Sequence, residues 1–156
     1  MSSVKENVDD FLAQKKIAVA GVSRHSKNEA ANFIFRKLRD SGFQVFPVNP
    51  NATTVEDTTC YPDLKSLPVA VDGVVIVTPP RVTEQLVREC AELHIPRVWI
   101  HRSMGQGSVS KAASEFCHEH HIAVISGGCP MMFCAPVDFG HKCMGWIVRL
   151  TGGMRG

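Results

Sequence analysis

Continuous apolar runs and amphipathic stripes alternate along this chain, and the alternation predicts its architecture. Runs without polar interruption, such as residues 17–20 and 73–77, are typical of strands buried on both faces of a parallel sheet. Between the runs, apolar residues recur at spacings of three and four, which is typical of helices packed on a core. Five strands are expected, at residues 17–22, 43–48, 73–78, 97–101 and 122–126.

The stripes also predict where the helices lie. Val4, Val8 and Phe11 share one face of a short helix within residues 1–15. Gly42 stands where a helix commonly ends, and Ser108 is a candidate N-terminal cap. Further helices are expected at residues 30–38, 82–93, 112–117 and 142–150. Residues 51–68 are expected to be irregular, with one short helical turn.

Strand and helix alternating about five times indicate an α/β fold. We expect a doubly wound, Rossmann-like five-stranded parallel sheet between two helical layers, as a three-layer sandwich. The length of 156 residues suits one domain, 1–156, in which residues 127–156 form a C-terminal extension. Ligands of such folds bind beyond the carboxyl ends of the strands. Candidate chemistry is therefore expected to follow residues 20, 48, 77 and 100.

Composition excludes several classes of protein. Hydrophobic residues make up 44% of the chain, yet no apolar run approaches the roughly 20 residues that span a membrane. A net charge of +2 is too mild to indicate nucleic acid. No export signal is evident, so a cytoplasmic location and reduced thiols are expected. The six cysteines are Cys60, Cys90, Cys117, Cys129, Cys134 and Cys143.

The turn after the first strand carries the strongest candidate chemistry. Gly21 allows a ligand to approach the backbone, and the following helix offers N–H groups to an anion. Arg24 and Lys27 add two positive charges at the same place. The turn therefore predicts a phosphate cradle, and the alternative is an exposed loop with two solvated basic side chains.

A dinucleotide site of the NAD type is the nearest rival. Ser23 and Ser26 stand where the glycine fingerprint would continue. The second strand ends in Asn49 and Pro50, where an NAD site would offer a carboxylate to the ribose. The pattern favours a ligand that carries more phosphate than NAD.

Five segments of the chain together resemble the small stand-alone coenzyme A (CoA)-binding proteins. That family shares a Rossmann-like domain with the N-terminal part of the succinyl-CoA synthetase alpha subunit. The resemblance extends over residues 16–130. It rests on residues 18–24 with Lys27, 42–50, 77–80, 98–100 and 128–132.

The resemblance implies that CoA or an acyl-CoA binds across the strand ends. On this basis the phosphates meet the first turn, at Gly21, Val22, Ser23, Arg24 and Lys27. The adenosine side is lined by Asn49, Pro50, Thr78, Pro79, Pro80 and Val82. The catalytic phosphohistidine of the synthetase belongs to a second domain, so His141 does not inherit that role.

Two residues stand near the expected pantetheine end. His101 follows the fourth strand, where many relatives have Gln. It either contacts the ligand or serves as an acid/base group, or it forms a surface pair with Arg102. Cys129 follows the fifth strand and either faces the CoA thiol or is a packed core thiol. No metal is expected, because Cys129, Cys134, His141 and Cys143 match no common zinc spacing.

The sequence thus favours a CoA-binding module over an enzyme, because no catalytic apparatus is evident. Two alternatives stay open: an NAD(P)-dependent oxidoreductase, and a thiol redox protein that uses Cys129. The expected partner is a small nucleotide ligand. The apolar face near Trp146 is compatible with core packing, a partner protein or a homo-oligomer.

Overall fold

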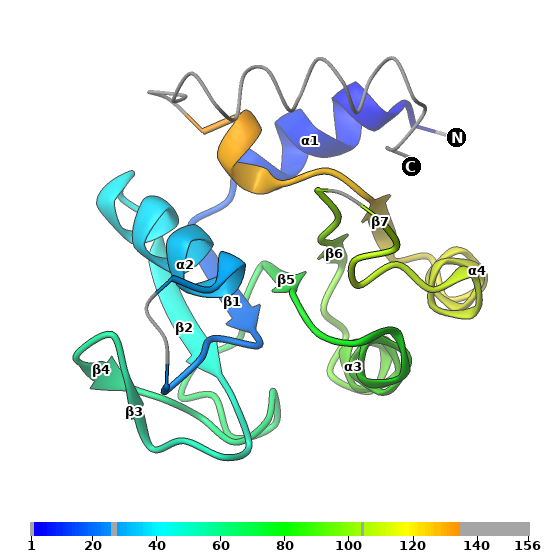
Figure 1. Cartoon of the computed structure of the whole chain (residues 1–156). Coiled ribbons are helices and arrows are strands. Elements are labelled where there is room, and N and C mark those ends of the chain that lie inside the picture. Colours follow the sequence, from blue (N-terminus) through cyan, green and yellow to red (C-terminus); the bar gives the residue numbers. More distant parts are fainter. Residues whose placement is uncertain (1, 26–27, 104, 135–156) are drawn as a thin grey trace.

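Five parallel strands form one sheet in the order β2-β1-β5-β6-β7 (Figure 1). The computed structural model describes residues 2–25, 28–103 and 105–134. The strands are β1 Lys16–Ala20, β2 Gln44–Val48, β5 Gly73–Ile76, β6 Arg97–Ile100 and β7 Ala123–Ser126. All four pairings between them are parallel, so the predicted doubly wound α/β sheet is confirmed.

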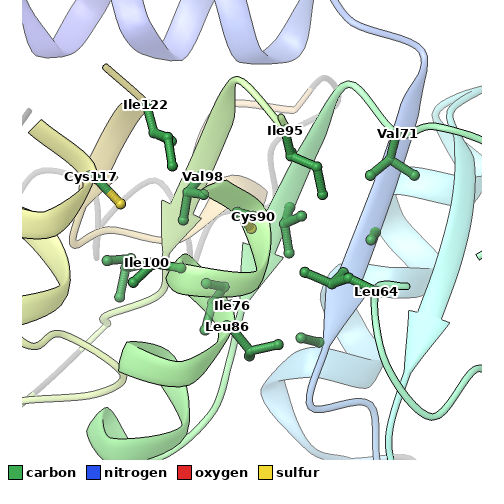
Figure 2. Packing of buried hydrophobic residues seen from close by; sticks show 14 of the residues in the cluster. Leu64, Val71, Ile76, Leu86, Cys90, Ile95, Val98, Ile100, Cys117 and Ile122 are labelled. Atoms are coloured by element: carbon green, nitrogen blue, oxygen red, sulfur yellow. The ribbon is translucent and has the colours of Figure 1, made fainter. Parts of the chain in front are cut away.

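Helices cover both faces of the sheet. One core cluster joins α1 (Val4–Leu12) and α2 (Ala30–Asp40) to the sheet. The other joins α3 (Pro80–Glu92) and α4 (Lys111–Glu119) to its opposite face. In Figure 2, Cys90 of α3 and Cys117 of α4 lie near Val98 and Ile100 of β6. The predicted three-layer arrangement is therefore confirmed.

The continuous apolar runs have a simple structural reason. In β1, Ile17 and Val19 belong to the first core cluster, whereas Ala18 and Ala20 belong to the second. Successive side chains of a strand point to opposite faces, so a strand covered on both faces needs apolar residues at every position. β1 is consequently almost wholly buried from Ile17 to Ala20.

The first helix, α1, packs on the same face of the sheet as α2, but at the end of the strand order away from β2. Phe11 of α1 meets the Trp99 ring edge-on, with 5.5 Å between the ring centroids. The Nε of Arg97 lies 2.6 Å from a carboxylate oxygen of Asp10. Ser3 caps α1 and exchanges hydrogen bonds with Glu6. The N-terminal helix predicted within residues 1–15 is thus confirmed.

Three details differ from the sequence-based expectations. The β1 strand ends at Ala20 and β5 at Ile76, two residues early, because the pairing between them stops there. Ser110, not Ser108, caps α4 by accepting from the Ala113 N–H. Residues 54–59, expected to be irregular, form a small antiparallel hairpin of β3 (Thr54–Val55) and β4 (Thr58–Thr59).

The segment after β7 begins with a 3-10 turn, η1 (Pro130–Met132). The helix expected at residues 142–150 lies outside the described residues, as does Trp146. None of the helices in the described ranges has the length and apolar character needed to cross a membrane.

Candidate functional site

The turn after β1 lies between the ends of β2 and β5 and contacts the backbone of both. The Gly21 N–H donates to the carbonyl of Val48, at the end of β2. A Cβ on Gly21 would lie 2.0 Å from the carbonyl oxygen of Val77, just beyond β5, and the residue has a φ of +102°. Glycine is therefore required here by the neighbouring backbone, independently of any ligand.

Two amide side chains fix the loop that follows. Asn32 of α2 accepts from the Ser23 N–H at 2.8 Å and donates to the Ser23 carbonyl at 3.0 Å. Asn49 donates to the Val22 carbonyl at 2.9 Å and accepts from the Asn51 N–H. The loop backbone is thus held from two elements, and Asn49 joins the ends of β1 and β2.

A cavity of about 250 Å³ lies beyond the carboxyl ends of β1, β2 and β5. Five of the residues predicted from the sequence line it together: Gly21, Asn49, Pro50, Thr78 and Val82. The Thr78 N–H donates to the Ser108 hydroxyl at 2.9 Å. The structure therefore brings the first, second and third strand ends into one site.

The same cavity has polar walls that sequence reasoning missed. Asp63, Gln85 and Glu89 line it, and Glu89 and Gln85 lie on α3 with Val82. Gln85 and Glu89 follow Val82 by three and seven residues, so they lie on the same face of the helix as Val82. This helical spacing could have predicted from the sequence that they line the same cavity. Burial raises the pKa of the Glu89 carboxyl, and the nearby Asp63 adds to the effect.

A second cavity, of about 630 Å³, lies between the first loop and the β3–β4 hairpin. Arg24 lines it from the loop, and Thr53 and Thr54 line it from the hairpin side. Pro50 and Pro62 line both cavities, so the two are adjacent. Because the Arg24 side chain is exposed, the second cavity has a positive charge at its rim.

The start of α2 follows the first loop in the chain. The cap residue, Glu29, makes no side-chain hydrogen bond to the first turn. The first N–H groups of a helix carry partial positive charge and attract anions. The Glu29 carboxylate opposes this attraction at the start of α2, so Arg24 is the described group that favours phosphate at the second cavity.

Several predicted residues line neither cavity. Val22 is fully buried, and the Ser23 hydroxyl accepts from the His25 N–H. Pro79 and Pro80 are the cap and first residue of α3, where proline is well tolerated. Lys27 lies outside the described residues.

His101 and Cys129 are likewise not among the described residues that line these two cavities. His101 is 8% exposed, and its Nε2 lies 3.0 Å from the Ser103 hydroxyl oxygen. Cys129 is 2% exposed and belongs to the core cluster around Trp99.

The described cysteines form no disulfide and are all buried. Within the described ranges no three His, Cys, Asp or Glu side chains gather as metal ligands. Of the cysteine and histidine residues considered for a metal, His141 and Cys143 lie outside those ranges.

The fold and the paired cavities define a Rossmann-like domain with a candidate ligand site at its carboxyl edge. Residues 15–135 match the family described as CoA binding domain. The chain therefore belongs to the CoA binding domain family.

Curated relatives are much longer than this chain. It is 28% identical over 130 residues to the ADP-forming acetate–CoA ligase II subunit alpha of Pyrococcus furiosus, covering 78% of this chain and 28% of that one. It is 33% identical over 85 residues to the ADP-forming acetate–CoA ligase II of Archaeoglobus fulgidus, covering 53% and 12%. The chain thus spans less than a third of either relative.

Solved structures of similar size share the fold. A conserved hypothetical protein from P. furiosus is 32% identical with a TM-score of 0.64, covering 73% of this chain and 93% of that one. A hypothetical protein from Pyrococcus horikoshii is 26% identical with a TM-score of 0.73, covering 81% and 86%.

Proposed function

We propose that this chain binds CoA or an acyl-CoA across the two adjacent cavities, and that it acts as a binding module. One observation carries the proposal. In a chain of the CoA binding domain family, two cavities that share Pro50 and Pro62 meet beside the Gly21 turn. An elongated ligand with an apolar-faced base and several phosphates matches such a pair of cavities.

The first cavity suits the adenosine part of the ligand. Its walls include Val82, Leu86 and two prolines, which offer apolar contact to a flat ring. Asp63 and Glu89 make the same cavity unfavourable for phosphate, because like charges repel. The phosphates are therefore assigned to the second cavity and the first loop, where Arg24 lies.

This assignment favours CoA over NAD. CoA carries a 3′-phosphate in addition to its diphosphate, and NAD has the diphosphate alone. The end of β2 offers the Asn49 amide, which is bonded to Val22 and Asn51, in place of a ribose-binding carboxylate.

A partner protein is a further part of the proposal. The P. furiosus relative is named as the alpha subunit of a ligase, and this chain spans 28% of it. We propose that the chain presents its CoA to a separate protein, as the name of that relative as a subunit suggests.

Titration calorimetry with CoA, dephospho-CoA and NAD tests the proposal. Arg24→Ala is expected to weaken CoA by roughly tenfold to a hundredfold, because a charge-assisted hydrogen bond contributes about 1.5–3 kcal/mol. Arg88→Ala is the matched control, since Arg88 is exposed on α3 and lines the groove toward α4. Equal affinity for all three ligands, or an equal loss in both variants, would contradict the proposal.

A further inference from the structure

The tip of the β3–β4 hairpin has an unfavourable backbone conformation. Glu56 has a φ of 48° and Asp57 a φ of 60°, and neither is glycine. Side chains disfavour this left-handed region, so such residues persist where their surroundings hold them. The hairpin thus places two strained residues in succession, and their contacts show what holds them.

Glu56 is held by two donors from α2. Its side chain is 6% exposed, and its Oε1 accepts from an Arg36 guanidinium nitrogen at 2.7 Å. The same oxygen accepts from the Asn32 Nδ2 at 2.9 Å. A buried carboxylate needs such partners, and here they come from positions 32 and 36, one helical turn apart. Glu56 therefore attaches the hairpin to α2.

Asn32 continues this connection to the first loop. It is 1% exposed, and its remaining hydrogen bonds go to the N–H and carbonyl of Ser23. A side chain so buried, with both its amide atoms engaged, has one orientation that satisfies all its partners. The loop backbone, Asn32 and Glu56 are thus joined in sequence by hydrogen bonds of 3.0 Å or less.

The joined elements are the two walls of the second cavity. Arg24 lines the cavity from the loop, one residue after Ser23, and Thr54 lines it from the first strand of the hairpin. Glu56 lies two residues beyond Thr54 at the hairpin tip. The distance between these walls therefore depends on the connection through Asn32.

We propose that Glu56 is a positioning residue that sets the width of the second cavity and so selects phosphate-bearing ligands. It does not touch the ligand, and it acts through Asn32 on the loop that carries Arg24. The inference rests on the proposed function, because the proposed function assigns the phosphates to this cavity. Its distinguishing consequence is that loss of Glu56 weakens phosphate-bearing ligands and leaves a nucleoside unaffected.

The test compares three ligands: CoA, adenosine 3′,5′-bisphosphate and adenosine. Glu56→Ala is expected to weaken CoA and the bisphosphate by about tenfold, the effect of about one hydrogen bond to a charged group. Its adenosine affinity should stay within about twofold of the wild type. Glu56→Gln keeps an acceptor oxygen for Asn32 and is expected to restore phosphate binding to within about threefold.

Two further variants separate positioning from folding. Asp57→Ala is the matched control, because Asp57 shares the positive φ but is exposed, and it should bind all three ligands as the wild type does. Glu56→Gly relieves the backbone strain, so it should fold and still lose phosphate binding. Thermal unfolding of each variant reports its stability.

The outcomes distinguish the inference from the proposed function. A wild-type protein that binds neither CoA nor the bisphosphate overturns both. Wild-type binding with an equal loss for adenosine in Glu56→Ala, or with no loss at all, overturns the positioning role alone. Failure of Glu56→Gln to restore binding, with stability unchanged, would also overturn it.

Discussion

The carboxyl edge of the sheet has two halves that differ sharply. Beyond β1, β2 and β5, the loops diverge and leave two adjacent cavities. Beyond β6 and β7, the described parts of the loops bond to one another. There the Arg102 N–H donates to the Gly128 carbonyl, and the Trp99 indole N–H donates to the Gly127 carbonyl.

The strand order explains the difference. The chain leaves β1 toward β2 on one side and later returns to β5 on the other. Loops from neighbouring strands therefore part at β1, which is the switch point where doubly wound folds bind ligands. From β5 through β7 the strands follow one another in order, so their loops pack side by side. Topology thus favours a ligand site on the half around β1.

Among substitutions at the half with the cavities, the largest effect on CoA binding and on stability is expected at Gly21. Gly21→Ala places a Cβ against the Val77 backbone at a positive φ, and we expect it to abolish CoA binding and cost roughly 3–5 kcal/mol of unfolding free energy. Gly42→Ala is the matched control, because Gly42 has a φ of +95° with nothing within 4 Å. It should cost only about 1–2 kcal/mol. Urea unfolding measures both, and equal costs would refute the close approach.

A smaller effect is expected from filling the first cavity. Val82→Trp should weaken CoA by at least about tenfold while the melting temperature stays nearly unchanged, because Val82 is 38% exposed and the ring can occupy the cavity. Val69→Trp is the control, since Val69 is also 38% exposed but lies outside both cavities. Titration calorimetry measures the CoA affinity of both variants. An equal loss of affinity would show that CoA does not bind in the first cavity.

The smallest effect concerns the thiols on the two halves. Both Cys60 and Cys129 are buried, but Cys60 lines the second cavity, whereas Cys129 follows β7 and belongs to the core cluster around Trp99. We expect a thiol reagent near pH 8 to label Cys60 first and CoA to slow that labelling several-fold. Cys117 should stay unlabelled, because burial raises its pKa to about 12. Peptide mapping by mass spectrometry gives the order of labelling, and early labelling of Cys129 would show that the region after β7 opens.

Hydrophobic periodicity predicted the sheet because burial on both faces leaves a clear pattern. It predicted strand ends less well: residues such as Val22 and Val77 are apolar yet lie beyond the last paired positions. The hairpin escaped prediction because Glu56 and Asp57 occupy turn positions that usually call for Asn or Gly. The residue types at the turn therefore did not predict it, because contacts with α2, distant in the sequence, stabilise the turn.

The candidate site was predictable at the strand ends and hidden elsewhere. Gly21, Asn49 and Thr78 follow strands directly, so the topology alone brings them together. Asn32 and Glu56 gave no such signal, because a polar residue in a helix or a loop is ordinarily solvated. Their roles depend on contact between residues 24 positions apart in the sequence.

The docking of α1 has a consequence for how the chain is made. Asp10 pairs with Arg97 across 87 residues, and Asn7 reaches the Val124 carbonyl across 117. During synthesis α1 leaves the ribosome before β6 and β7, so its docking surface is complete only after β7 has emerged. A nine-residue helix is marginal alone in water. α1 is therefore translated before the surface against which it packs, and Trp99 lacks its contact with Phe11 until that surface has formed.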